Sequence, residues 1–282
     1  MSMRGPGLAA RLVGNAGVYL LMLFVVAISL APLLWVAVSS LKTNAEILNS
    51  AFSVPARPSL AGYIHAIRIS HFGQFFANST IISACAVLIG LLIYSMAGYV
   101  LARFDFRGKT LVLLGVGFTL LIPGYSFIQP IFRMVSAAGL YNTRIALVIV
   151  YITGGMAASV YIMVSGFKSI PKEMEESAYI DGASFPQIFW MIAFPLVRAS
   201  MVSTLILRFL GHWNEFLWAF LLTSSTSKRT VPVALRYFNL QFSYNYPAMF
   251  AALIMAIVPS ILIYLVFMET ISKSVTSGAL KG

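Results

Sequence analysis

Three polar side chains interrupt an otherwise apolar stretch and are the first candidates for chemistry in this sequence. Arg208, His212 and Glu215 are spaced i, i+4 and i+7, so on an α-helix they fall within about 60° of arc at ~100° per residue. Such a face should be turned toward protein or water, and we expect the Arg208–His212 and His212–Glu215 pairs to satisfy one another. The face could line a polar path, or it could fix its helix against a neighbouring one.

A second polar group lies in a short stretch between two apolar runs. Pro171 is suited to a helix start, and the carboxylates at 173–176 complement the positive end of that helix. Gly182 accepts the left-handed conformation that ends many helices, and Ser184 with Pro186 can cap and open a second short helix. The stretch therefore predicts a helix, a tight turn and a second helix, with acidic and small residues at a corner that another protein could contact.

Signatures of an enzyme or of a metal site are missing from the sequence. The three histidines form no HExxH pair, and there is no GxSxG elbow. Gly108-Lys109-Thr110 resembles the end of a phosphate-binding loop, but Arg103 stands where that motif needs glycine. We expect a chain that is not catalytic, holds no metal and binds no cofactor of its own.

Composition indicates that these groups are positioned by membrane helices. The chain has 282 residues, of which 60% are apolar and 10% charged, which leaves too little polar surface for a soluble globule. Several runs exceed the roughly 20 apolar residues that a spanning helix needs. We expect an all-α, polytopic membrane protein, a single membrane domain over 1–282 with six transmembrane helices. The expected spans are 16–38, 76–101, 110–132, 145–167, 199–223 and 248–268.

The positive charge is explained by membrane topology and not by nucleic acid. The net charge is +11, but the basic residues lie at span ends and in short loops. An even number of spans places both termini on one side, and the basic loop 103–109 favours the cytoplasm for that side. Prolines inside expected spans can kink them, although proline is also simply common in membrane helices. These prolines are Pro32, Pro123, Pro130 and Pro259.

The acidic stretch also carries a family resemblance. Its spacing is Glu176-Ser177-Ala178, three residues, Gly182, nine residues, Ile192, one residue, and Phe194-Pro195. This pattern closely resembles the EAA loop of binding-protein-dependent ABC importer permeases, with serine at 177 where alanine is commoner and phenylalanine at 194 where leucine is.

Further segments are similar to the carbohydrate branch of that family, the maltose-type inner-membrane permeases. They are SLKTNAEI at 40–47, YVLARFDFRGK at 99–109, WNEFLWA at 213–219 and TSGALKG at 276–282. The resemblance implies the type I ABC importer permease fold, a multi-pass protein of the bacterial inner membrane, cytoplasmic termini and a cytoplasmic loop at 168–198. It also implies a second homologous permease, two ATPase subunits that bind ATP and Mg, and an extracytoplasmic solute-binding protein.

The same resemblance implies roles for particular residues. The coupling residues, which would contact the ATPase, are Glu176, Ser177, Ala178, Asp181 and Gly182. We expect polar contacts from Glu176 and Asp181, close approach at Ala178 and the turn at Gly182. The short helix at 171–182 would then be the lever that carries motion into the membrane.

Candidates for the translocation path combine flat rings with polar groups, as sugar sites do. Beside the Arg208, His212 and Glu215 face, they are Trp213, Asn214 and Trp218, together with Tyr125 and Gln129 near the prolines of the third span. Aromatic residues near span ends also serve as interface anchors, and the pocket can belong mainly to the sister permease.

Other functions remain open at this point. ABC permeases for glycerol phosphate, polyols or other small solutes share these motifs. An ion-coupled secondary transporter is a second alternative, but it would use intramembrane acids, and Glu215 is the only acid clearly inside an expected span. A membrane enzyme would need a catalytic constellation that the sequence lacks.

Overall fold

The structure is a computed structural model that describes residues 8–68, 71–241 and 245–279, with side chains over 16–68, 71–236 and 245–268. Within these ranges the chain is mostly helical and has no β-strand, which confirms the all-α prediction. It divides into two compact units. Unit 1 comprises Met1–Ser70 with Phe238–Met255, and unit 2 comprises His71–Tyr237 with Ala256–Gly282.

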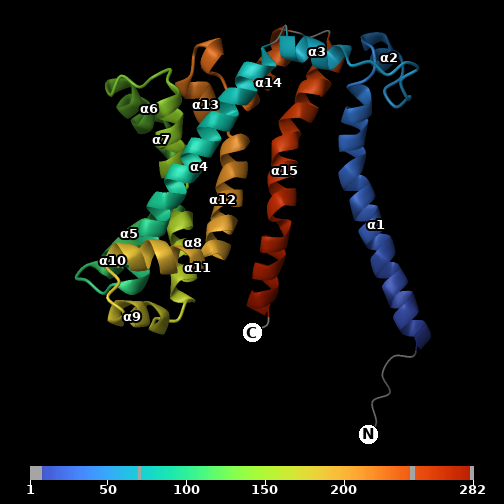
Figure 1. Ribbon diagram of the computed structural model, residues 1–282. Coiled ribbons are helices and arrows are strands. Elements are labelled where there is room, and N and C mark those ends of the chain that lie inside the picture. Colours follow the sequence, from blue (N-terminus) through green and yellow to red (C-terminus); the bar gives the residue numbers. More distant parts are fainter. Residues whose placement is uncertain (1–7, 69–70, 242–244, 280–282) are drawn as a thin grey trace. The chain divides into compact units, whose positions relative to one another are not determined.

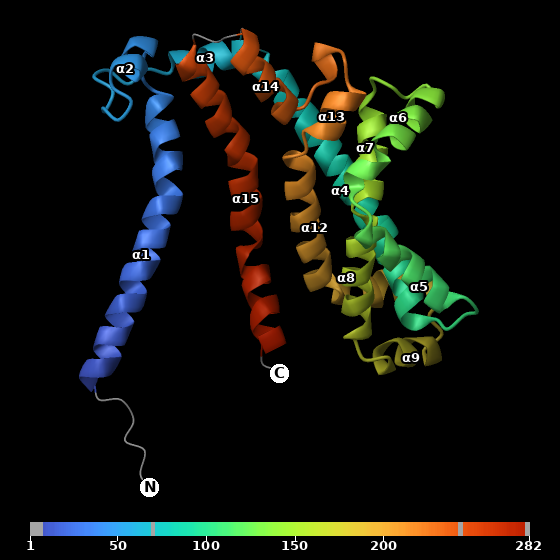
Figure 2. The same ribbon diagram turned by 180° about the vertical axis from the view of Figure 1, so that it is seen from behind.

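The helices follow one another along the chain as Figures 1 and 2 show. Unit 1 contains α1 (Leu8–Ser39), α2 (Asn44–Asn49) and α3 (Ala61–Arg68). Unit 2 contains α4 (Phe72–Arg103), α5 (Lys109–Phe118), η1 (Thr119–Leu121), η2 (Gly124–Phe127), α6 (Ile128–Ala137), α7 (Arg144–Gly154), α8 (Met156–Lys168), α9 (Glu173–Ile180), α10 (Phe185–Gln187), η3 (Ile188–Ala193), α11 (Phe194–Leu196), α12 (Arg198–Trp213), α13 (Leu217–Leu222) and η4 (Thr226–Lys228). Two helices, α14 (Val231–Gln241) and α15 (Tyr246–Ala279), have residues in both units.

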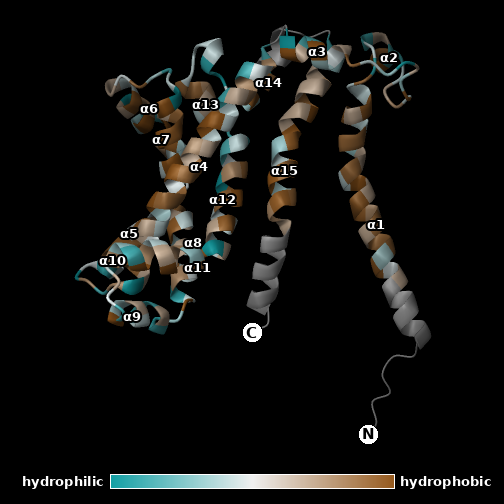
Figure 3. Cartoon of the chain, viewed as in Figure 1, coloured by the Kyte–Doolittle hydropathy of each residue, from teal (hydrophilic) through white to brown (hydrophobic). Residues whose placement is uncertain are grey.

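Three helical segments are long and apolar enough to cross a membrane, namely Ala16–Ser39, Phe72–Arg103 and Tyr246–Met268. Three bent helix pairs pass the same test together, so the described residues hold up to six such segments if each pair is one span. Figure 3 shows hydrophobic colour along α1 and α4 and more hydrophilic colour around α9 and α10. The six span boundaries given above stay a prediction.

The bends occur where the backbone loses helical hydrogen bonds. The 98° bend between Lys109–Leu121 and Gly124–Ala137 contains Pro123, which has no amide hydrogen to donate. The 52° bend between α7 and α8 contains the Gly154-Gly155 pair, and the 72° bend before α12 follows Pro195. By contrast, Pro32 and Pro259 lie inside the continuous helices α1 and α15.

A compact group of hydrogen-bonded polar residues follows α1 in unit 1. Lys42 is 2% exposed and donates from Nζ to the carbonyl oxygen of Ala51 at 2.9 Å. Thr43 and Glu46 form a capping box at the start of α2, and Glu46 Oε1 also accepts from the amide of Ala56 at 2.9 Å. These hydrogen bonds hold the pKa of the Glu46 carboxyl below its usual value. The segment 40–47 thus closes the loop after α1.

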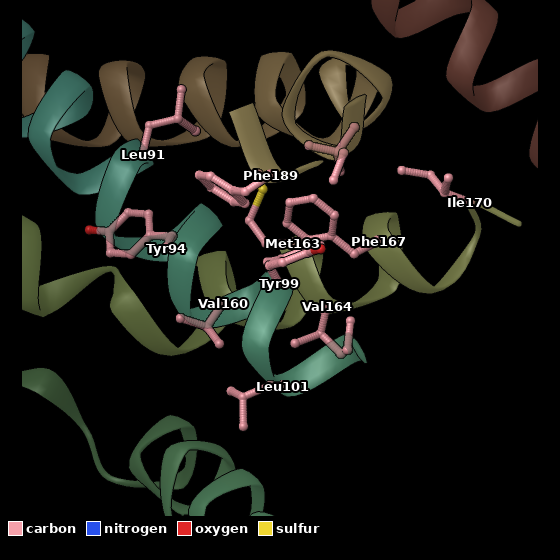
Figure 4. Close-up of a cluster of buried hydrophobic side chains, with 13 residues drawn as sticks. Leu91, Tyr94, Tyr99, Leu101, Val160, Met163, Val164, Phe167, Ile170 and Phe189 are labelled. Atoms are coloured by element: carbon pink, nitrogen blue, oxygen red, sulfur yellow. The ribbon is translucent and has the colours of Figure 1, made fainter. Parts of the chain in front are cut away.

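Helix α4 is the centre of unit 2, because α7, α8 and α12 all pack against it. One buried cluster joins α4 to α8 and to η3 (Figure 4). Its largest fully buried members include Tyr94, Met163 and Phe167. The two helices approach closely at Gly98, where a Cβ atom would collide with Met163. Glycine is therefore required at this crossing.

A second buried cluster joins α4 to α6, α7, α13 and α14. Two asparagines fix the loop residues beside it. Asn78 on α4 donates from Nδ2 to the carbonyl oxygens of Ser227 and Arg229, each at 2.9 Å. Asn142 accepts from the amides of Ser224 and Ser225 at 3.1 and 3.0 Å. Figures 1 and 2 show α6 and α13 at the opposite end of unit 2 from α9.

The buried cluster between α4, α8 and η3 predicts which phenylalanine stabilises the fold. Replacing Phe167 with alanine removes a side chain that is 0% exposed and leaves a cavity beside α4. We expect the free energy of unfolding to fall by about 3 kcal/mol, which is the lower limit for such substitutions in soluble cores. The lower limit applies because, between membrane helices, the lost van der Waals contacts matter more than transfer out of water. The measurement is thermal unfolding in detergent micelles. Phe118→Ala is the control, since Phe118 is 63% exposed, and an equal loss in both variants would contradict the packing assignment.

Candidate functional site

The acidic segment forms the helix and turn that the sequence predicted. α9 begins at Glu173, two residues after Pro171, and ends at Ile180. The amide of Ala183 donates to the carbonyl of Ala178 at 2.9 Å, and the amide of Gly182 donates to the carbonyl of Tyr179 at 3.1 Å. This pair of hydrogen bonds is the Schellman arrangement. Gly182 has φ of +86°, so the prediction of a left-handed turn at this glycine is confirmed.

The second short helix is also present. Ser184 and Gln187 form a capping box, and Pro186 lies in the first turn of α10. The chain then continues through the π-helical segment η3 into α11, and the 72° bend leads to α12. The turn is therefore joined by a nearly continuous helical path to the helix that carries Arg208.

Glu175 anchors α9 to the end of α4, and the sequence alone did not indicate this. Its Oε1 accepts from Arg103 Nε at 2.7 Å, and its Oε2 accepts from the Tyr99 hydroxyl at 2.8 Å. Arg103 also donates from Nη2 to the carbonyl oxygen of Ile170 at 3.0 Å. The Arg103 and Glu175 side chains are only 7% and 12% exposed. An ion pair so well shielded, with further hydrogen bonds on both partners, holds α9 in one position.

Tyr99 extends this anchor into an aromatic cluster. Its ring centroid lies 5.2 Å from that of Phe167, 5.1 Å from that of Phe189 and 5.7 Å from that of Phe185. These rings come from α8, η3 and α10, and Figure 4 shows Tyr99, Phe167 and Phe189 close together. One tyrosine thus contacts the helix before the acidic segment and both elements after it.

The opposite side of α9 is open. Glu176 and Asp181 are exposed, and within the described residues their carboxylates have no hydrogen bond or ion pair. Tyr179 and Ile180 are 74% and 83% exposed. Ser177 is exposed at the surface and donates its hydroxyl to the carbonyl of Glu173 at 2.8 Å. We call this surface, made of 176–182, the α9 surface; it combines two carboxylates with two large apolar side chains.

The polar face near residue 210 differs from the prediction. α12 ends at Trp213, so Glu215 lies beyond the helix and the three side chains do not share one helical face. Glu215 accepts from the Tyr151 hydroxyl at 2.9 Å and from the amides of Trp218 and Ala219 at 2.8 and 3.0 Å. It therefore caps the start of α13.

His212 also takes a partner outside the predicted pairs. Its Nε2 lies 3.1 Å from the carbonyl oxygen of Tyr151, and its ring stacks on the Tyr151 ring at 4.9 Å. The prediction that Arg208, His212 and Glu215 pair with one another was wrong. Tyr151 on α7 is hydrogen-bonded to both His212 and Glu215, and it lies 61 and 64 residues from them in the chain, so the spacing along one helix could not reveal it.

The remaining path candidates are dispersed. Trp213 is 2% exposed, donates to the carbonyl of Ala256 at 2.9 Å and stacks on Phe209. Asn214 is exposed and donates to the carbonyl of Leu210. Tyr125 and Gln129 are exposed in η2 and α6. A cavity of about 480 Å³ in unit 2 is lined by Arg208 and Trp218 but not by these four residues. Their roles in transport stay predictions.

Comparison with known proteins shows which protein family this sequence matches. The sequence profile of the family described as "Binding-protein-dependent transport system inner membrane component" matches residues 90–277. This range contains both halves of the anchor, Arg103 and Glu175, and the whole α9 surface.

Relatives of similar length match over nearly the whole chain. The diacetylchitobiose uptake system permease protein NgcG of Streptomyces coelicolor is 34% identical over 256 residues, which is 90% of this chain and 85% of that protein. The trehalose/maltose transport system permease protein MalG of Thermococcus litoralis is 31% identical over 90% of this chain and 92% of its own.

A solved structure shares the fold. A chain of a bacterial ABC transporter involved in the import of the acidic polysaccharide alginate superposes with a TM-score of 0.82 at 22% identity. The match covers 95% of this chain and 99% of that one. This likeness shows the type I ABC importer permease fold that the sequence predicted.

The anchor predicts a local loss of order when its carboxylate is neutralised. In Glu175→Gln the Arg103 guanidinium keeps its shielded position without a counter-charge, which costs about 3–5 kcal/mol for a buried pair. We expect faster hydrogen exchange of the backbone amides of 173–182. The control is Asp105→Asn, which breaks the Asp105–Lys109 pair. That carboxylate is 92% exposed, so its loss should leave exchange in α9 unchanged. Equal exchange in wild type and Glu175→Gln would contradict the anchor.

Proposed function

The chain belongs to the family of binding-protein-dependent transport system inner-membrane components, and from this premise we propose that it forms half of the translocation pathway of an ATP-driven importer for a carbohydrate. The chain is itself a transport component of the membrane and not an enzyme. ATP and Mg would bind to separate ATPase subunits, and a second homologous permease would complete the path. A solute-binding protein outside the cytoplasm would deliver the substrate.

The observation that carries the proposal is the anchored α9 surface. A motor subunit can move a permease only through a contact that does not yield. On one side of α9, Glu175 is held by Arg103 and Tyr99 of α4. On the other side, exposed carboxylates and apolar side chains are free to contact a partner. This arrangement supports the role of a lever, and it supports the coupling roles predicted for Glu176, Ser177, Ala178, Asp181 and Gly182.

The carbohydrate assignment rests on relatives. The names of the matching permeases include diacetylchitobiose and trehalose/maltose uptake systems. A bacterial alginate transporter was solved with an alginate-bound periplasmic protein, and its chain shares this fold with a TM-score of 0.60. These findings favour a saccharide over glycerol phosphate, a polyol or another small solute.

Orientation is part of the proposal. With the α9 surface in contact with ATPases, the loop 168–198 lies in the cytoplasm. An even number of spans then places both termini, which lie outside the described residues, on the cytoplasmic side. Cys85 is replaced by serine and a cysteine is introduced at exposed position 173; labelling in inside-out but not in right-side-out vesicles is expected.

The proposed function is tested by whether uptake depends on the ATPase subunits. The chain is reconstituted in proteoliposomes with a second permease, two ATPase subunits and a solute-binding protein, and uptake of the saccharide bound by that protein is measured. We expect uptake to need ATP and to stop when the ATPases are omitted. Uptake that follows an ion gradient without ATPases would instead indicate a secondary transporter.

Gly182 provides a sharper prediction for the lever. No atom of the described residues lies within 4 Å of its Cβ position, so within this chain a substitution acts through the positive φ. Valine in the left-handed conformation costs at least roughly 1–2 kcal/mol, whereas asparagine accepts it. We expect Gly182→Val to lose most ATP-driven uptake and most ATPase association, and Gly182→Asn to retain both. Unchanged uptake in Gly182→Val would defeat the lever.

A further inference from the structure

The cavity of unit 2 lies where the helical conformation is interrupted in two bent helix pairs. Its volume of about 480 Å³ falls in the range of about 300–1,000 Å³ that small-molecule sites occupy. One side is the break between α5 and α6, and the other is the break between α7 and α8. The lining also includes the aromatic side chains of Phe127 and Trp218. Non-helical backbone inside a membrane protein is expected where it lines such a cavity.

Arg208 gives this cavity a positive charge that no counter-charge among the described residues balances. It is the only charged side chain among the described residues of the lining, and its Nε atom is buried without a hydrogen-bond partner there. The ion pairs found in the described residues involve Arg103 and Lys109 instead. The nearest acid along the chain, Glu215, is occupied by Tyr151 and by the start of α13.

The start of α8 adds to the positive potential. This helix of 13 residues begins at Met156, and its first residues, 156–158, line the cavity directly after Gly155. The first amides of a helix have no partner within the helix and favour an anion. Gly155 allows the Arg208 guanidinium to lie against this helix start, because a Cβ atom there would collide with it. Two groups that attract anions thus meet in one cavity.

We infer that this cavity binds the anionic group, a carboxylate or a sulfonate, of an acidic saccharide. The inference rests on the proposed function and narrows its substrate class. The guanidinium would form paired hydrogen bonds with two oxygens of the group, the amides at the start of α8 would complete its shell, and Trp218 or Phe127 would face the sugar ring. The anion would replace the counter-charge that the described residues do not supply.

The test is binding by the full chain in nanodiscs of phosphatidylcholine, measured by titration calorimetry. Digalacturonate is the anionic probe, and galactobiose is its neutral counterpart. We expect wild type to bind digalacturonate, and Arg208→Gln to weaken this binding at least tenfold while its binding of galactobiose is unchanged. Arg208→Lys should keep part of the affinity. Arg198→Gln, which removes an exposed arginine of the same helix, should bind as wild type does.

A second variant separates charge from geometry. Gly155→Ala keeps the charge of Arg208 but displaces its guanidinium, and Gly155 has φ of −112°, which alanine can adopt. We expect weaker digalacturonate binding in this variant as well. No binding of digalacturonate by wild type, equal affinity for both sugars, or equal affinity in wild type and Arg208→Gln would overturn the inference.

Lipid is the other source of an anion. In nanodiscs with phosphatidylglycerol, digalacturonate should still bind if the site takes a saccharide. The opposite result has two parts: the wild type no longer binds digalacturonate in these nanodiscs, and native mass spectrometry shows phosphatidylglycerol bound to the wild type but not to Arg208→Gln. That result would assign the site to a lipid headgroup and overturn the inference of a saccharide site. The assay needs no ATP. Failed anion binding beside intact ATP-driven uptake would reject this inference and leave the proposed function standing.

Discussion

The ion pair between Arg103 and Glu175 is the interaction on which the functional account depends. It joins the end of the longest helix in unit 2 to a short acidic helix that otherwise has a largely exposed surface. α9 is only eight residues long, and a helix of that length is not stable by itself in water. Its position therefore comes from the shielded pair, the Tyr99 hydroxyl and the Schellman turn at Gly182.

Unit 2 tolerates breaks in its helices because side chains and neighbouring helices form hydrogen bonds with backbone groups that the breaks leave without helical partners. Glu215 accepts two amides at the start of α13, and Asn142 accepts two amides after it. At the Gly154-Gly155 break, the carbonyl oxygen of Gly155 accepts the Ser159 hydroxyl at 2.7 Å. A membrane interior offers no water for these groups, so the partners supplied by Glu215 and Asn142 stabilise the breaks on either side of α13. The break between α7 and α8 and the break between α5 and α6 instead line the cavity that contains Arg208.

Local features of the sequence predicted local structure well. Proline, carboxylates and glycine with the spacing of 171–182 gave a helix and a left-handed turn, and both are present. The all-α class followed from the length of the apolar runs in the sequence. The bend at Gly154-Gly155 was not predicted, although two adjacent glycines inside an apolar run are a recognisable signal.

Partners distant in the chain could not be predicted. Three glutamates open α9 with similar local surroundings, and only the fold decides that Glu175 meets Arg103, 72 residues earlier. The pairs expected along α12 failed for the same reason, because Tyr151 of α7 takes both His212 and Glu215. Sequence periodicity places residues on a face, but it does not say which helix that face meets.

The most direct test of the rigid anchor is a distance measured during the transport cycle. Spin labels at positions 88 on α4 and 173 on α9, both exposed, are introduced after Cys85 is replaced by serine, and electron–electron double resonance is recorded in the assembled transporter with and without ATP. The account predicts one narrow distance distribution that ATP does not change, because α9 and α4 move as one body. A broad distribution, or a shift on addition of ATP, would contradict it.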